Sequence, residues 1–345
     1  MRRRTYDERD VRIRPGRGSR PRTKQRPTHA DAATALVTTV DRGRYTTLLD
    51  GRVVVAMKAR ELGRSRVVPG DEVDLVGDLS GKPGTLARIV RIAPRRTVLR
   101  RTADDTDPTE RVVVANADQL VIVTALAEPE PRIRMIDRCV VAAYDAGMDA
   151  VLALTKADLA DPTPLSSLYA AAGVRVVVTS LEPGQEIAGL DALRDTLDGQ
   201  VSVLVGHSGV GKSTLVNALV PHARRATGVV NEVTGRGRHT STSAVALPVT
   251  GCDAETWVID TPGVRSFGLA HVDPAHLLAA FTDLAEVATA SCPRGCTHLA
   301  DAPDCALDEW ATALDVDAPQ RTTRQARLDS LRRLLTSRLG TDDSD

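Results

Sequence analysis

Five short runs of apolar residues, many of them β-branched, lie between residues 33 and 101. They span residues 35–40, 45–49, 53–56, 73–75 and 87–92. Turn sequences such as Asp50-Gly51 and Pro69-Gly70 separate them. Short strands joined by turns at this spacing are typical of a small five-stranded barrel. We therefore predict an OB-fold β-barrel over residues 31–102.

The hydrophobic pattern changes beyond residue 110, where short, nearly continuous apolar runs alternate with longer mixed segments. The runs span residues 120–124, 150–154, 175–179, 201–205 and 257–259. Runs of this kind fit strands of a parallel sheet that is covered on both faces. Beyond about residue 270 the pattern is helical, and it ends in an amphipathic basic segment from Pro319 to Leu339. We predict an α/β domain over 103–272 and a helical module over 273–345.

The first 30 residues show neither pattern. They contain 11 Lys and Arg, three acidic residues and three prolines, with very few apolar residues. Such a segment cannot bury enough surface to offset an ordering entropy of about 1–2 kcal/mol per residue. We predict a disordered basic tail over residues 1–30.

The formal net charge is zero, but basic and acidic residues are unevenly distributed along the chain. Residues 1–102 hold 25 Lys and Arg but 11 Asp and Glu, whereas the remaining residues hold 20 and 34. This division predicts a polyanionic partner for the first part. No apolar run reaches the roughly 20 residues of a membrane-spanning helix, and the basic start lacks the apolar core of a signal peptide. We expect a cytoplasmic protein without a membrane partner.

A phosphate-binding motif, G-x-x-x-x-G-K-[ST], follows the apolar run 201–205 directly. The motif and the next residue are Gly206, His207, Ser208, Gly209, Val210, Gly211, Lys212, Ser213 and Thr214. The glycines let backbone N–H groups surround the phosphates at a helix N-terminus, Lys212 reaches the β- and γ-phosphates, and the Ser213 hydroxyl binds Mg²⁺. The sequence therefore predicts a nucleoside triphosphate site.

The base is indicated by Thr155-Lys156-Ala157-Asp158, which follows the run 150–154. In this [NT]-K-x-D pattern the aspartate accepts hydrogen bonds from guanine N1–H and N2–H₂, and the lysine packs against the base. Adenine offers no such pair of donors, so the pattern favours GTP over ATP. Thr179 and Ser180, after the next predicted strand, fit a second loop that contacts the base.

Mg²⁺ requires further oxygen ligands. Asp260 begins the sequence Asp260-Thr261-Pro262-Gly263, in which the carboxylate holds Mg²⁺ through water and the Gly263 N–H faces the γ-phosphate. Thr240 and Thr242 are both candidates for the threonine that senses Mg²⁺, and the sequence does not choose between them. In an ordinary GTPase the phosphate motif precedes the guanine motif, whereas here it follows, which indicates a circular permutation.

Three cysteines and a histidine cluster near the C-terminus. They are Cys292, Cys296, His298 and Cys305. Three thiolates and one imidazole within 14 positions predict a closed, tetrahedral and therefore structural Zn²⁺ site. Cys139 and Cys252 have no such neighbours in the sequence and are interpreted as packing residues.

Together these motifs resemble the ribosome small-subunit-dependent GTPase A family over about residues 33–315. The resemblance rests on GHSGVGKST, GRGRHT and DTPGVRSFGL, on the barrel before them and on the Cys/His cluster after them. It implies a GTPase that binds the small ribosomal subunit late in its maturation and leaves on GTP hydrolysis. The family usually spaces its zinc ligands x₄, x and x₅, whereas here the first gap is one residue shorter and the last one longer.

The expected hydrolysis differs from that of Ras-like enzymes in one position. Those enzymes place a water-orienting glutamine after D-x-x-G, where this chain has Val264. A valine cannot hydrogen-bond water, so we expect slow intrinsic turnover and activation by a partner. Lys212 is expected to act on the phosphates, and His239 is the candidate that positions water. The alternative for His239 is a loop histidine that is exposed or contacts RNA.

Three functions remain open at this point: a ribosome-assembly GTPase, a P-loop ATPase or kinase, and an RNA-binding scaffold with GTP as a structural ligand. The basic tail and barrel favour rRNA as a partner, and Tyr45, the only aromatic residue between 28 and 102, argues against recognition by base stacking. The terminal helix is either a further RNA surface or packed through Leu328, Leu331 and Leu335. We expect a monomer that binds GTP and GDP, one Zn²⁺ and Mg²⁺.

Overall fold

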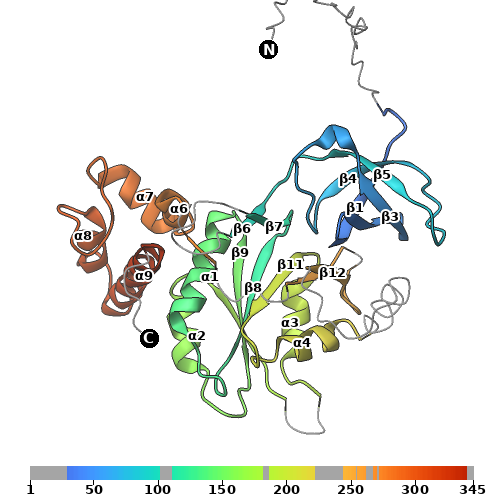
Figure 1. Ribbon diagram of the computed structural model, residues 1–345. Coiled ribbons are helices and arrows are strands. Elements are labelled where there is room, and N and C mark those ends of the chain that lie inside the picture. The colour runs from blue at the N-terminus through green and yellow to red at the C-terminus, as the bar shows by residue number, and fades with distance from the viewer. Residues whose placement is uncertain are drawn as a thin grey trace, which may run out of the picture. The chain divides into compact units, whose positions relative to one another are not determined.

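The computed structural model describes residues 29–101, 111–181, 186–221, 244–253, 255–261, 267–269 and 272–339. The chain divides into two units, Met1–Asp31 and Ala32–Asp345, and every described helix and strand belongs to the second (Figure 1). Residues 1–28 of the predicted basic tail lie outside the described residues. None of the described helices is both long enough and apolar enough to cross a membrane.

The predicted five-stranded barrel is confirmed. Its strands are β1 (Ala33–Asp41), β2 (Arg44–Leu49), β3 (Arg52–Lys58), β4 (Glu72–Gly77) and β5 (Ala87–Ile92). β1 pairs antiparallel with both β2 and β4, and β3 pairs parallel with β5, so the order β1-β2-β3-β5-β4 closes on itself. Alternate residues such as Val37 and Leu75 are buried inside, as the period of two requires. The closed order is that of an OB-fold.

A two-stranded sheet, β6 (Val98–Arg101) and β7 (Arg111–Ala115), follows the barrel. The Pro69-Gly70 turn of the barrel contacts the end of β7, because Ala115 N donates to Pro69 O at 3.1 Å and Asn116 Nδ2 donates to Gly70 O at 2.9 Å. Gly70 has φ +87°, and a Cβ there would lie 2.0 Å from Ala115 O. Only glycine fits this contact.

The central sheet confirms the α/β domain. Its strands are β8 (Gln119–Ala125), β9 (Asp149–Thr155), β10 (Arg175–Val178), β11 (Val201–Gly206), β12 (Val245–Pro248) and β13 (Trp257–Asp260). They lie in the order β10-β9-β8-β11-β13-β12, and all pairs are parallel except β12 with β13. β12 also pairs with β1 of the barrel at Val245 and Thr39.

Helices cover both faces of this sheet. They are α1 (Ile133–Asp145), α2 (Thr163–Ala170), α3 (Leu190–Leu197) and α4 (Lys212–Leu219). Every residue of β8 is buried. Leu120 and Ile122 share a core cluster with residues of α1 and α2, whereas Val121 and Val123 share one with residues of α3 and α4. This two-sided burial explains why residues 120–123 of the strand form a continuous apolar run.

The C-terminal module consists of α6 (Pro274–Ala279), α7 (Thr282–Ser291), α8 (Ala306–Thr312) and α9 (Ala318–Arg338). Its apolar residues share a core cluster with α1, and Leu328, Leu331 and Leu335 of α9 are buried there. The packed interpretation of the terminal helix is therefore confirmed. Its arginines also bond within the chain: Arg321 to Val316 O, Arg324 to Asp315, Arg327 to Asp283, Arg332 to Asp308, Arg333 to Asp137 and Arg338 to Val272 O.

Candidate nucleotide and metal sites

The phosphate-binding motif lies where the sequence predicts, between the end of β11 and the start of α4. Gly209 and Gly211 have φ of +84° and +88°, which residues with a side chain rarely adopt. A Cβ at Gly206 would lie 2.6 Å from Val123 O of β8. The glycines therefore allow a tight turn against the neighbouring strand, with the helix N-terminus facing the loop. Ser208, Ser213 and Thr214 are exposed there.

Lys212 and Asp260 form an ion pair, in which the lysine Nζ donates to Asp260 Oδ1. β11 and β13 are paired neighbours, with Leu204 opposite Asp260, so the topology brings the two groups to the same edge of the sheet. The Thr261 hydroxyl donates to Leu204 O at 2.8 Å and is fully buried. The group expected to bind phosphate and the carboxylate expected to bind Mg²⁺ are thus side by side.

The guanine motif begins at Thr155, the last residue of β9. Asp158 is exposed and so accessible to a base, whereas Thr155 is buried, and its hydroxyl donates to Val210 O of the phosphate loop at 2.6 Å. Lys156 has φ +58°, and its ammonium donates to Glu128 O in the loop after β8. Thr155 thus ties the guanine motif to the phosphate motif, a contact that the sequence analysis did not foresee.

The second candidate base loop lies beside the first. Thr179 is buried, its hydroxyl donates to Leu154 O at 3.1 Å, and its carbonyl accepts from Ala157 N at 3.3 Å. Ser180 exchanges two backbone hydrogen bonds with Ala188. These contacts fix the loop against the Thr155–Asp158 turn.

One further contact at this edge was missed by sequence reasoning. Arg132, just before α1, places Nη1 3.5 Å from Nε2 of His207 in the phosphate loop. The available signal was position alone, because Arg132 follows the carboxyl end of β8, where ligands of parallel sheets bind. Gly263, Val264, His239, Thr240 and Thr242 lie outside the described residues.

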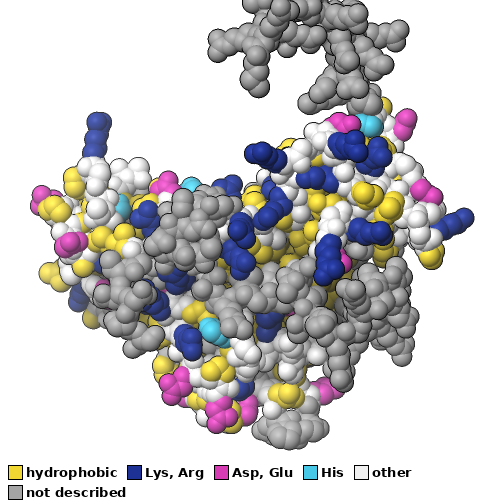
Figure 2. Space-filling model, viewed as in Figure 1, with side chains coloured by type: hydrophobic (Ala, Val, Ile, Leu, Met, Phe, Trp, Pro, Cys, Tyr) yellow, Lys and Arg dark blue, Asp and Glu magenta, His cyan; other side chains and the backbone are white. Residues whose placement is uncertain are grey.

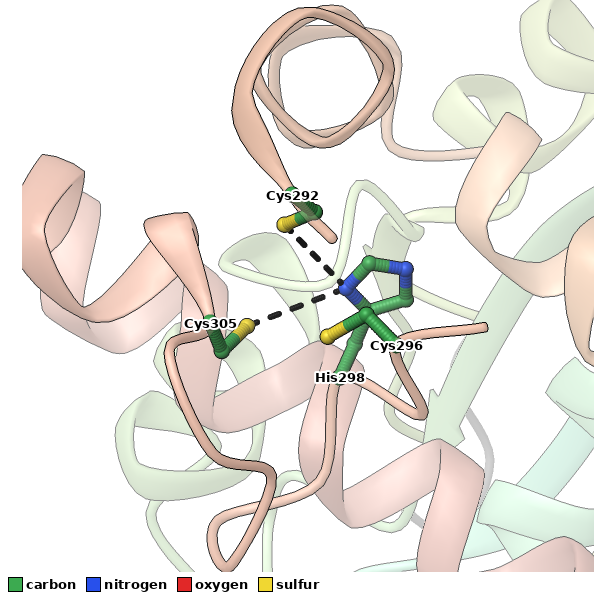
Figure 3. A group of neighbouring side chains, drawn as sticks. All are labelled: Cys292, Cys296, His298 and Cys305. Carbon is green, nitrogen blue, oxygen red and sulfur yellow. Dashed lines mark hydrogen bonds between the residues drawn. The ribbon is translucent and has the colours of Figure 1, made fainter. Parts of the chain in front are cut away.

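The cysteine and histidine residues converge, as Figure 3 shows. One ligand atom from each of Cys292, Cys296, His298 and Cys305 lies within 4.8 Å of the others. Cys292 follows α7 and Cys305 immediately precedes α8, while the other two come from the loop between these helices. The changed spacing of the residues therefore does not prevent their convergence.

The donor set fits Zn²⁺. His298 Nδ1 lies 3.7 Å from Cys292 Sγ and 3.8 Å from Cys305 Sγ, close to the roughly 3.6 Å expected between a nitrogen and a sulfur on one tetrahedral Zn²⁺. Burial, together with the charge of Arg332, lowers the pKa of His298 and favours the neutral imidazole that binds metal. Arg332 also donates Nε to His298 O at 3.3 Å, which holds the loop against α9.

Comparisons with known proteins agree on the family. The family model described as RsgA GTPase matches residues 92–270. A relative from Gemmatimonas aurantiaca, named small ribosomal subunit biogenesis GTPase RsgA, is 35% identical over 79% of this chain and 86% of its own length. One of the same name from Pseudomonas syringae pv. tomato is 41% identical over 64% of this chain and 63% of its own length.

Two solved structures share the fold. The crystal structure of YjeQ from Thermotoga maritima aligns with a TM-score of 0.63 and 23% identity, covering 90% of this chain and 100% of that chain. YloQ, described as a circularly permuted GTPase, aligns with a TM-score of 0.62 and 19% identity over 92% and 99%. This chain combines the permuted motif order, the OB-fold barrel and the Cys/His module. It belongs to the RsgA GTPase family of GTP-hydrolysing enzymes.

Proposed function

We propose that this GTPase binds the small ribosomal subunit late in its maturation and leaves when GTP is hydrolysed. The observation that carries the proposal is the family membership, together with the printed name of the relatives, small ribosomal subunit biogenesis GTPase. The combination of a basic OB-fold barrel with a permuted GTPase supports it. In this proposal the protein acts as a monomer in the cytoplasm, and residues 31–102, 103–272 and 273–345 are its functional domains.

At the nucleotide site, Asp158 reads guanine and Lys212 holds the β- and γ-phosphates. Ser213 and Asp260 hold Mg²⁺, with Thr240 or Thr242 as a further ligand. When bound, Mg²⁺ neutralises charge on the phosphates. The ion pair between Lys212 and Asp260 supports these roles, because it brings the two groups within reach of one ligand. Thr155, Thr179 and Ser180 support the base loops, as their hydrogen bonds indicate.

The Cys/His cluster binds one Zn²⁺ with a structural role. Four protein ligands complete a tetrahedral site and leave no open position for a substrate. The loop between α7 and α8 has little apolar core of its own, so the metal would supply much of its stability.

The barrel supplies the rRNA surface. Lys and Arg side chains are prominent over it in Figure 2. The exposed basic residues on its strands and loops are Arg42, Arg44, Arg52, Arg60, Arg64, Arg66, Lys82, Arg88 and Arg91. Tyr45 is buried, so it offers no ring for stacking. This surface suits the phosphate backbone of folded RNA, and its affinity should fall steeply with salt.

Turnover of GTP with and without purified small subunits tests the proposal. We expect slow turnover by the protein alone, because Val264 cannot orient water, and a rise of at least about tenfold with small subunits but not with large subunits. ATP should neither be hydrolysed at a comparable rate nor compete with GTP.

The same assay addresses the alternatives. An equal rate with and without small subunits would overturn the proposal and favour a scaffold that keeps GTP as a structural ligand. Effective competition by ATP would favour the ATPase or kinase alternative. His239→Ala decides the role of that histidine, since loss of the stimulated rate supports water positioning and a full rate supports an ordinary loop residue.

A further inference from the structure

We propose that Arg138 and Arg338 are positioning residues, which hold the segment following the Mg²⁺ carboxylate between helices α1 and α9 and thereby couple the helical module to GTP hydrolysis. The proposal rests on the proposed function, because it explains how a bound subunit stimulates turnover. It concerns residues 267–269 and Val272, which lie between Thr261 and α6 and belong to the described part of the chain.

The GTPase domain holds the beginning of this segment. Arg138 of α1 donates Nε and Nη2 to Phe267 O at 3.0 and 2.6 Å. Phe267 and Leu269 are fully buried. Upstream, the Thr261 hydroxyl is fixed to Leu204 O. Thr261 is thus bonded to β11, and Phe267 is bonded to α1.

The terminal helix holds the end of the same segment. Arg338, in the last turn of α9, donates Nε to Val272 O at 2.7 Å, and Val272 N donates to Leu269 O at 3.0 Å. Val272 is buried. A displacement of α9 relative to the GTPase domain would therefore act on Val272, five residues after the carbonyl that Arg138 holds.

A third arginine joins α9 to α1 directly. Arg333 Nε lies 3.2 and 3.1 Å from the two carboxylate oxygens of Asp137, and its guanidinium lies 5.2 Å from the ring centre of Tyr169. The Tyr169 hydroxyl lies 3.0 Å from Asp137 Oδ1. Asp137 and Arg138 are consecutive on α1, so one turn of this helix contacts both α9 and Phe267. Arg138, Arg333 and Arg338 thus link α1 and α9 to each other and to Phe267 and Val272.

The contact between α9 and α1 leaves buried polar atoms without hydrogen bonds to the described part of the chain. Arg333 Nη2 and Ser337 Oγ are buried without a hydrogen-bond partner among the described residues. Burial also raises the pKa of Asp137, and Arg333 only partly offsets this effect. Buried polar atoms without hydrogen-bond partners destabilise the arrangement that contains them. Displacing α9 at this contact therefore costs less free energy than at a fully hydrogen-bonded contact. A contact of this kind suits an element with two arrangements.

The test compares two arginines of the same helix. Arg338→Gln removes the contact to Val272, whereas Arg324→Gln is the matched control, because Arg324 bonds to Asp315 and to Trp310 O within the helical module. GTP turnover is measured at increasing concentrations of small subunits. We expect Arg338→Gln to lower the maximal stimulated rate by about 2- to 30-fold, the range found for residues that carry coupling between sites.

The other readouts separate coupling from a general structural defect. The subunit concentration for half-maximal stimulation, the zinc content and the melting temperature should stay close to wild type in Arg338→Gln, and Arg338→Lys, which keeps a donor, should restore much of the rate. Arg333→Gln should lower the stimulated rate in the same way. If Arg338→Gln does not fold, the stimulated rate of Arg333→Gln tests the coupling instead.

The outcomes distinguish the two proposals. If small subunits do not stimulate the wild-type protein, the proposed function fails. If they stimulate wild type and Arg338→Gln equally, the proposed function stands and the coupling inference is wrong. An equal loss in Arg324→Gln and Arg338→Gln would also overturn the inference, because it would show a general effect of α9.

Discussion

Within the tetrapeptide Thr155–Asp158, one residue supports the site and another is available for recognition. Thr155 is buried and bonds to Val210 O of the phosphate loop, while Asp158 is exposed three residues later. The positive φ of Lys156 turns the chain between them. The buried hydroxyl links the two motifs, so the exposed carboxylate has a fixed place relative to the phosphate loop.

This division leads to a prediction for Asp158→Asn. The neutral amide cannot accept from both N1–H and N2–H₂ of guanine, so we expect GTP affinity to fall by at least about tenfold, as the loss of hydrogen bonds to a charged group implies. Xanthosine triphosphate should bind the variant better than it binds wild type, because its O2 accepts from the amide. Nucleotide titration measures both affinities, and unchanged GTP affinity would remove Asp158 from the site.

For individual residues, the sequence predicts which ones belong to a motif but not which residues they bond to in the fold. The phosphate and guanine motifs are recognisable because their chemistry needs fixed residue types at short spacing. The hydroxyl contact from Thr155 to Val210 O and the pairing of Lys212 with Asp260 join residues about 50 positions apart. Such contacts depend on strand order, which a local pattern does not contain.

Among the elements, those with a strong hydrophobic pattern were predicted, and three short strands beside polar segments were missed. The barrel strands, the buried parallel strands and α9 were found within a few residues. β6, β7 and β12 were not foreseen, although β10 and β13, which have four residues each, were predicted. Each of the missed strands lies beside a polar segment. β6 pairs with β7, and β12 pairs with β13 and with β1 of the barrel, so their stability comes from strand pairing rather than from their own sequence.

In the proposed function, bound zinc stabilises the Cys/His loop. We predict that Cys305→Ser loses bound zinc and lowers the free energy of unfolding of the helical module by about 4 kcal/mol or more, the scale of losing a structural metal. Zinc per chain and thermal unfolding are the measurements. GTP affinity should stay near the wild-type value, because the cluster shares no residue with the nucleotide site.

Cys252→Ser is the control for this change. Cys252 is half-buried, and it lies outside the described metal cluster. This variant should keep one zinc per chain and unfold near the wild-type temperature. If Cys305→Ser also kept its zinc, the cluster would not be a zinc site.

The zero net charge of the whole molecule is the sum of a positive part, residues 1–102, and a negative part, residues 103–345. The positive charge of residues 1–102 belongs to the tail and the barrel, which we assign to rRNA. In the rest of the chain several of the described basic groups have specific partners, such as Lys212 with Asp260 and the arginines of α9 with the carboxylates and carbonyls around them. The permuted order then leads from the nucleotide loop straight into the helical module.

If the protein leaves the small subunit when GTP is hydrolysed, as proposed, its nucleotide state controls its attachment to the subunit. Equilibrium binding of the full chain to purified small subunits, with a non-hydrolysable GTP analogue or with GDP at one fixed salt concentration, tests it most directly. We predict at least about fivefold tighter binding with the analogue, the lower end of typical coupling between two sites. Equal affinity in the two states, or tighter binding with GDP, would show that GTP hydrolysis does not release the protein from the subunit.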